Sequence, residues 1–197
     1  MNSKSILSLL LAAALPLLAQ ETWTIDTSHS SAQFAVRHMM VSTVRGTLGK
    51  ITGTVKFDPK NLPASSVEAS IDASTIDTRH AKRDEDLRGP EFFDVAKYPK
   101  MTFQSTKIVA AGKGKYKMTG NLTMRGVTKQ VTFDVEGPVP AVSDGKGGRK
   151  SGATATAKIN RREFGLNYNA VIETGGVVVS DEVTITLDIE LNQAKAS

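Results

Sequence analysis

The stretch SGATATAKIN, residues 151–160, decides the fold class, because its apolar side chains fall on every second position. Ala153, Ala155, Ala157 and Ile159 form one face of this stretch, and most of the residues between them are polar. Side chains alternate between the two faces of a β-strand, so we expect a strand with one face turned inward. That face is built mostly from alanine, and small side chains fill less of the interior behind a sheet than large ones do.

The same period of two recurs along most of the chain. Eight strands are predicted, near residues 30–38, 47–57, 67–73, 101–109, 115–124, 130–136, 152–160 and 182–191, with shorter candidates at 22–26 and 167–174. Turn-forming residues separate these runs, and no comparable series of helical periods appears. The pattern therefore predicts an all-β domain, an antiparallel eight-stranded barrel. A barrel of that size either packs solid or holds one small ligand.

One charged segment departs from this pattern. Residues 78–88 read TRHAKRDEDLR and are followed by Gly89 and Pro90. This composition suits one short helical segment that the Gly-Pro pair terminates. Phe92 and Phe93 come next, in a long connection without strand periodicity. Long connections with aromatic anchors are often functional, so we expect this one to close an end of the barrel.

The first twenty residues, MNSKSILSLLLAAALPLLAQ, combine one basic residue with an apolar stretch and small residues, as a cleaved secretory signal peptide does. Residues 21–197 are then expected to be a single domain in the periplasm. The chain has no cysteine, which excludes a disulfide framework, a thiolate metal site and cysteine catalysis. Its formal charge is +5, but acids lie between the bases and aromatic residues make up only 6%, so no nucleic-acid partner is predicted.

Candidate catalytic and metal-binding residues are few. His29 and His38 are nine positions apart on one extended segment and should face opposite sides, so no metal site is predicted. His80 and Asp84 lie one turn apart on the predicted helix, a spacing that lets a carboxylate orient an imidazole. No serine nucleophile motif accompanies them. We therefore assign no catalytic residue and predict a binding protein, not an enzyme.

Several motifs resemble those of the YceI-like proteins, and the resemblance runs through the whole chain after the signal peptide. The motifs are WTID at 23–26, HS at 29–30, RDEDLR at 83–88, FFDV at 92–95, GNLTMRGVTK at 120–129 and REFGL at 162–166. The resemblance implies a lipocalin-like barrel whose elongated apolar cavity holds a long-chain amphiphile. The expected ligand is a polyisoprenoid, such as a quinone tail, or a fatty acid or amide, and no other cofactor is implied.

The ligand site is predicted from the inward faces of the strands. The expected wall residues are Phe34, Val36, Phe103, Met118, Leu122 and Phe133. Phe92 and Phe93 are expected to form a lid, and His38 or Arg79 is expected nearest the head group. Gly53 and Gly120 are expected to leave additional space. Two alternatives stay open: a lipid-modifying enzyme that uses His80 and Asp84, and a ligand-free scaffold for a membrane redox protein with its interior filled by side chains. A transient membrane contact and a homodimer also stay open.

Overall fold

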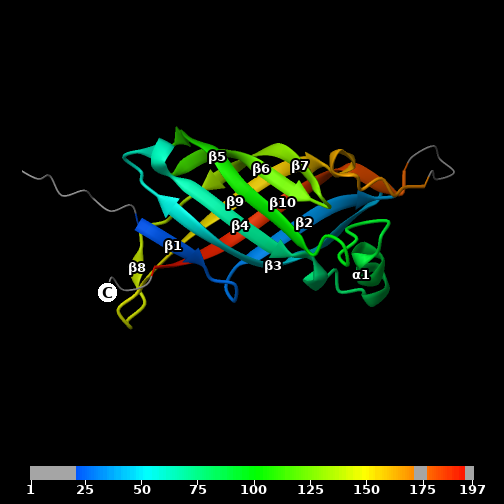
Figure 1. The fold of residues 1–197 in the computed structure, drawn as a ribbon, viewed down its shortest axis with the longest axis horizontal. Coiled ribbons are helices and arrows are strands. Elements are labelled where there is room, and N and C mark those ends of the chain that lie inside the picture. Colours follow the sequence, from blue (N-terminus) through cyan, green and yellow to red (C-terminus); the bar gives the residue numbers. More distant parts are fainter. Residues whose placement is uncertain (1–20, 171–176, 194–197) are drawn as a thin grey trace, which may run out of the picture.

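Ten strands form one sheet in the computed structural model, which describes residues 21–170 and 177–193 (Figure 1). They are β1 (Glu21–Ile25), β2 (Ser31–His38), β3 (Ser42–Phe57), β4 (Ser66–Asp72), β5 (Lys100–Gly112), β6 (Lys115–Met124), β7 (Val127–Glu136), β8 (Val142–Ser143), β9 (Arg149–Asn160) and β10 (Val179–Gln193). Eight of them close an antiparallel ring in the order β10-β2-β3-β4-β5-β6-β7-β9, with β9 pairing back to β10. The predicted all-β, eight-stranded, lipocalin-like barrel is confirmed.

The helical segments are short. They are α1 (Ala81–Arg88) and the 3-10 turns η1 (Leu62–Ala64), η2 (Ala73–Thr75) and η3 (Arg161–Phe164). The helix predicted over 78–88 begins later, because His80 caps it: its Nδ1 accepts a hydrogen bond from the Arg83 backbone N–H at 3.3 Å. Gly89 ends the helix as predicted, donating its N–H to two carbonyls of the last turn. Within the described residues, no helix has the length and apolarity needed to cross a membrane.

The predicted strands differ from the observed ones mainly at their ends. β3 starts at Ser42, five residues before its predicted start, because residues 42–46 pair with β2. The shorter candidate at 22–26 is present as β1. The candidate at 167–174 is wrong over residues 167–170, which form no strand, and its remainder lies outside the described residues. The predicted signal peptide, residues 1–20, also lies outside them.

Four connections gather at one end of the barrel because successive strands of the ring run in opposite directions. They are residues 39–41, 73–99, 125–126 and the described residues between η3 and β10, 165–170 and 177–178, and we call this end the mouth. Figure 1 shows α1 and the β2–β3 connection at the mouth, with β8 at the opposite end. The mouth therefore carries the long charged and aromatic segment that the sequence analysis singled out.

The ring has one weak seam. Three residue pairs join β7 to β9, whereas twelve join β9 to β10. Beyond these three pairs, toward the mouth, β7 and β9 are not paired with each other. η3 contacts β7 there, and its Phe164 is only 1% exposed. The turn η3, with Phe164 buried, thus packs beside β7 where strand pairing is missing.

Candidate functional site: an apolar cavity and its mouth

The barrel is hollow. Its interior contains a cavity of about 210 Å³, lined by side chains from the strands of the ring, from α1 and from the connection that follows α1. A single water needs only about 10–15 Å³ of such space, so the void is much larger than a packing defect. The alternative in which side chains fill the interior does not fit this geometry.

The predicted wall and lid residues all line this cavity. They are Phe34, Val36, Phe92, Phe93, Phe103, Met118, Leu122 and Phe133. Phe103 of β5 and Phe133 of β7 meet edge to face, with ring centroids 5.3 Å apart and ring planes at 83°. Strand periodicity brings the six wall residues to one side of the sheet, as predicted from the sequence, whereas Phe92 and Phe93 reach the cavity from the connection after α1.

Alanines widen the cavity, but the glycines do not. Ala69, Ala153 and Ala155 line the cavity. The Phe103 ring instead packs against Gly120, where an added Cβ would overlap the ring. At Gly53, an added Cβ would lie 2.9 Å from the Cα of Ala69 on the neighbouring strand. The predicted free space at Gly53 and Gly120 is therefore wrong, because both glycines allow close packing.

A second hollow, of about 720 Å³, lies at the mouth. It shares Phe34, Val36, Leu87, Phe92 and Val179 with the inner cavity, so one continuous apolar surface leads from the mouth inward. The rim of this mouth groove is polar and carries both signs of charge. Its charged residues and histidine are Arg37, His38, Lys82, Arg83, Glu85, Asp86 and Glu91.

The two predicted head-group residues lie in different places. His38 lines the mouth groove, within reach of a polar group that remains outside the cavity. Arg79 lines neither hollow; it is exposed and has a left-handed backbone with φ of 59°. The predicted head-group role of Arg79 is not supported, because alternation cannot position a residue that precedes a helix in such a conformation.

The two lid phenylalanines differ in burial and contact. Phe93 is 8% exposed, and its backbone N–H donates to the carbonyl of Leu87 at 3.0 Å, so it is fixed beneath α1. Phe92 lines both hollows and packs on Tyr168, with ring centroids 4.8 Å apart. Phe92 therefore lies where the cavity meets the mouth groove.

Arg161 is a cavity residue that the sequence analysis missed. Among the described residues lining the cavity it is the one charged side chain, and that side chain is 5% exposed. Its guanidinium donates to the carbonyls of Leu166, Val179 and Ser180, and burial lowers its pKa. Arg161 thus ties the connection after η3 to the start of β10. The alternation of β9, continued two residues past Ile159, would have placed Arg161 on the inner face.

Arg125, in the β6–β7 turn, holds two other mouth segments together. One guanidinium nitrogen donates to the carbonyl of Gly165 at 2.5 Å, and the other donates to the carbonyl of Pro90 at 2.6 Å. The segment that carries Phe92 is therefore bound to the segment that follows η3. No sequence periodicity indicates this bridge, because turns have none.

The structure does not bring His80 and Asp84 together as a catalytic pair. The His80 Nδ1 accepts from the Arg83 backbone, while the buried Asp84 carboxylate accepts from the backbone N–H and hydroxyl of Thr78, at 2.8 and 2.5 Å. Both side chains are engaged in holding the start of α1. This geometry gives the lipid-modifying alternative no support.

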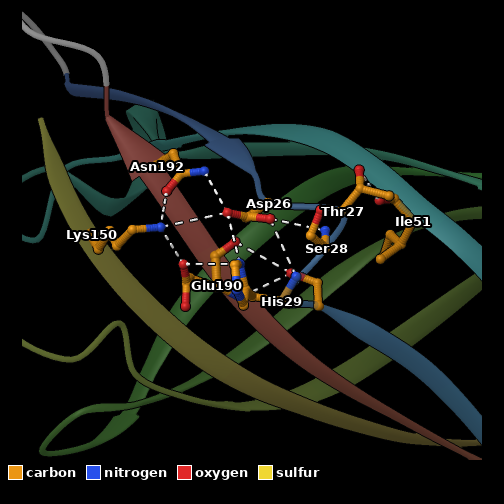
Figure 2. Close-up of polar contacts among 9 residues, drawn as sticks. Asp26, Thr27, Ser28, His29, Ile51, Lys150, Glu190 and Asn192 are labelled. Atoms are coloured by element: carbon orange, nitrogen blue, oxygen red, sulfur yellow. Dashed lines mark hydrogen bonds and ion pairs between the residues drawn. The ribbon is translucent and has the colours of Figure 1, made fainter. Parts of the chain in front are cut away.

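A polar cluster lies on the outside of the barrel, where the β1–β2 turn meets β10 (Figure 2). Asp26 accepts from Asn192 at 2.9 Å, its carboxylate lies 3.1 Å from the His29 imidazole, and these partners hold the pKa of Asp26 well below its usual range. Ligand atoms of Asp26, His29 and Glu190 lie within 4.8 Å of one another, a spacing that could suit a metal. The Lys150 ammonium already pairs with the carboxylates of Asp26 and Glu190, at 3.5 and 2.5 Å. The cluster therefore acts as an ionic clamp, a set of ion pairs that joins the β1–β2 turn to β9 and β10.

Comparisons with known proteins agree with this architecture. The model of the YceI-like domain family matches residues 23–191. The UPF0312 protein of Vibrio parahaemolyticus is 39% identical over 161 residues, covering 80% of this chain and 85% of the relative. Among solved structures, Burkholderia cenocepacia BcnA is similar with a TM-score of 0.70 and 26% identity, covering 84% of this chain and 98% of that one.

A polyisoprenoid binding domain from Saccharophagus degradans has the same fold, with a TM-score of 0.62 over 89% of this chain and all of that one, at 13% identity. The family match spans nearly the whole barrel, from β1 to β10. On this evidence the chain belongs to the YceI-like domain family.

Proposed function

We propose that this protein is a periplasmic carrier of a long-chain amphiphilic lipid, with a polyisoprenoid or fatty-type chain as the ligand. The observation that carries the proposal is the apolar cavity that continues into a polar-rimmed groove at one end. An amphiphile matches this arrangement: its chain lies among Phe34, Phe103 and Phe133, and its polar end remains near His38. The polyisoprenoid binding domain from Saccharophagus degradans, which shares the fold, supports the same ligand class.

The energetics favour a long chain. Transfer of one methylene out of water contributes about 0.8 kcal/mol, so a dozen methylenes contribute about 10 kcal/mol before the cost of ordering the chain. The described cavity lining offers no free charged group to balance a buried anion, since the hydrogen bonds of Arg161 are directed at carbonyls. The charged part of a ligand is therefore expected at the mouth.

Native mass spectrometry of the exported protein, followed by organic extraction, tests this function. A defined mass added to the polypeptide, identified as one class of long-chain lipid, is the expected result. A bare polypeptide that stays bare after incubation with polyprenyl and fatty lipids would contradict the carrier function. Cell fractionation with N-terminal sequencing tests the periplasmic location separately.

A further inference from the structure

The β2–β3 connection, residues 39–41, presents three apolar side chains to solvent at the mouth. Met39 is 42% exposed, Met40 is 54% exposed and Val41 is 79% exposed. Methionine and valine are usually buried, and three adjacent ones at the tip of a hairpin form a contiguous apolar surface. We call residues 39–41 the apolar tip.

The backbone of the apolar tip does not call for these side chains. Met39 and Met40 both have left-handed backbones, with φ of 48° and 61°. Asparagine and glycine are the usual residues at such positions, because other side chains are strained there. Nothing about the turn itself therefore explains two consecutive methionines, whose flexible apolar side chains suit variable apolar partners.

The apolar tip is held in place by its neighbours. Arg37 donates to the carbonyl of Met40 at 2.7 Å and to the Thr43 hydroxyl at 3.0 Å. Within the turn, the N–H of Val41 donates to the carbonyl of His38 at 3.1 Å, and the N–H of Met39 donates to the carbonyl of Val178 on the β10 side. The apolar side chains are thus presented on a braced turn.

The hairpin that ends in the apolar tip carries charge of one sign, and the acidic residues of the mouth groove, Glu85, Asp86 and Glu91, belong to α1 and the connection after it. No acidic residue occurs between Asp26 and Asp58, a stretch that includes all of β2 and β3. Arg37 and Arg45 are exposed, and the strand register places both on the outer face of the hairpin, close to its tip. An apolar end flanked by two arginines complements a surface that is anionic outside and apolar beneath.

The apolar tip also borders the route into the barrel. Arg37, His38 and Val44, which flank it on both strands, line the mouth groove that leads to the cavity. A bilayer in contact with residues 39–41 would therefore face the groove through which an amphiphile reaches the interior.

We propose that the apolar tip docks the protein on an anionic phospholipid bilayer, with Met39, Met40 and Val41 below the headgroups and Arg37 and Arg45 among the phosphates. This inference rests on the proposed lipid-carrier function and adds the place at which the lipid is exchanged. One basic residue near an anionic surface contributes about a fivefold gain in binding, so the two arginines together contribute about 25-fold.

A single fluorophore can locate the contact, because the chain has no native cysteine. Val41→Cys, labelled with nitrobenzoxadiazole, is expected to brighten and shift to the blue when vesicles of phosphatidylcholine and phosphatidylglycerol are added. Val142→Cys is the matched control, since Val142 is also exposed, at 62%, but lies on β8 at the opposite end. Equal fluorescence changes at the two positions would overturn the proposal. The same change at Val41→Cys without vesicles, caused by raising the protein concentration alone, would also overturn it.

A second variant separates docking from folding. Met39→Asn combined with Met40→Gly suits the left-handed backbone better than the native residues, so the barrel should keep or gain thermal stability. We expect this variant to bind lipid in solution like the native protein and to lose most of its binding to the same vesicles. Unchanged vesicle binding would refute the docking site while leaving the carrier function intact. Failure of both proteins to bind lipid in solution would refute the carrier function, whatever the vesicles show.

Discussion

Ala155→Phe is expected to shorten the cavity and so limit the length of chain that the protein binds. Ala155 lies midway along β9, is 6% exposed and lines the cavity. It is paired with Leu187 on β10 and Val135 on β7, so the position of its Cβ is fixed on both sides. A phenyl ring there must project into the space that a bound chain would use.

The size of the effect follows from methylene transfer. Each methylene contributes about 0.8 kcal/mol, which is about fourfold in Kd. If the ring displaces about three methylenes, the loss is about 2.4 kcal/mol, or roughly 60-fold. Chains short enough to end before Ala155 should lose much less.

Titration calorimetry with a series of amphiphiles that share one head group and differ in chain length can measure this. The native protein should gain affinity steadily along the series, and Ala155→Phe should reach a plateau at shorter chains. Thr156→Phe is the control, because Thr156 is the next residue on β9 and is exposed. Parallel gains in affinity for Ala155→Phe and the native protein would refute a chain bound inside the barrel.

Three further predictions concern stability. Phe133→Ala removes a ring that is 3% exposed and should cost about 3–5 kcal/mol of unfolding free energy in urea denaturation; a negligible loss would contradict the packing described. Arg161→Met leaves buried carbonyls without a hydrogen-bond donor, and each should cost about 1–3 kcal/mol of unfolding free energy. Hydrogen exchange over residues 166–170 should become faster; unchanged exchange would argue against the bracing role of Arg161. The pKa of Asp26 is lowered in the folded state. Its contribution to the free energy of unfolding is therefore present above the ordinary carboxyl pKa of about 4, and it is lost as the pH falls toward the pKa of the folded state. Asp26→Asn should therefore lower the melting temperature at neutral pH and flatten its decline in acid; an equally steep decline would contradict the clamp.

Much of the fold could be predicted because each strand of the ring has one face inside and one outside. Residues such as Ala155 and Phe133 carry that period of two, and the structure places them on the cavity wall. Strand ends were harder to predict. Residues 42–46 have a weak alternation of their own and become strand because β2 is beside them.

The parts of the site that the sequence did not indicate are those made between distant segments. Phe103 and Gly120 are on different strands, and only the register shows that the ring occupies the space left by the glycine. Arg125 donates hydrogen bonds to the carbonyls of Pro90 and Gly165, which lie in two connections far apart in the sequence. Only the folded arrangement of these connections brings the two carbonyls to Arg125. Arg161 was within reach of prediction, since it continues the inward face of β9.

The seam between β7 and β9 gives the barrel an uneven resistance to expansion. A ring of hydrogen bonds parts first where the fewest bonds hold it, and here three residue pairs stand against twelve on the other side of β9. The other strand pairs of the ring are longer, so the β7–β9 seam is its weakest joint. The turn η3, which carries the buried Phe164, lies beside this seam. We therefore expect a wide ligand to open the barrel at this seam, next to η3, before it separates the longer strand pairs.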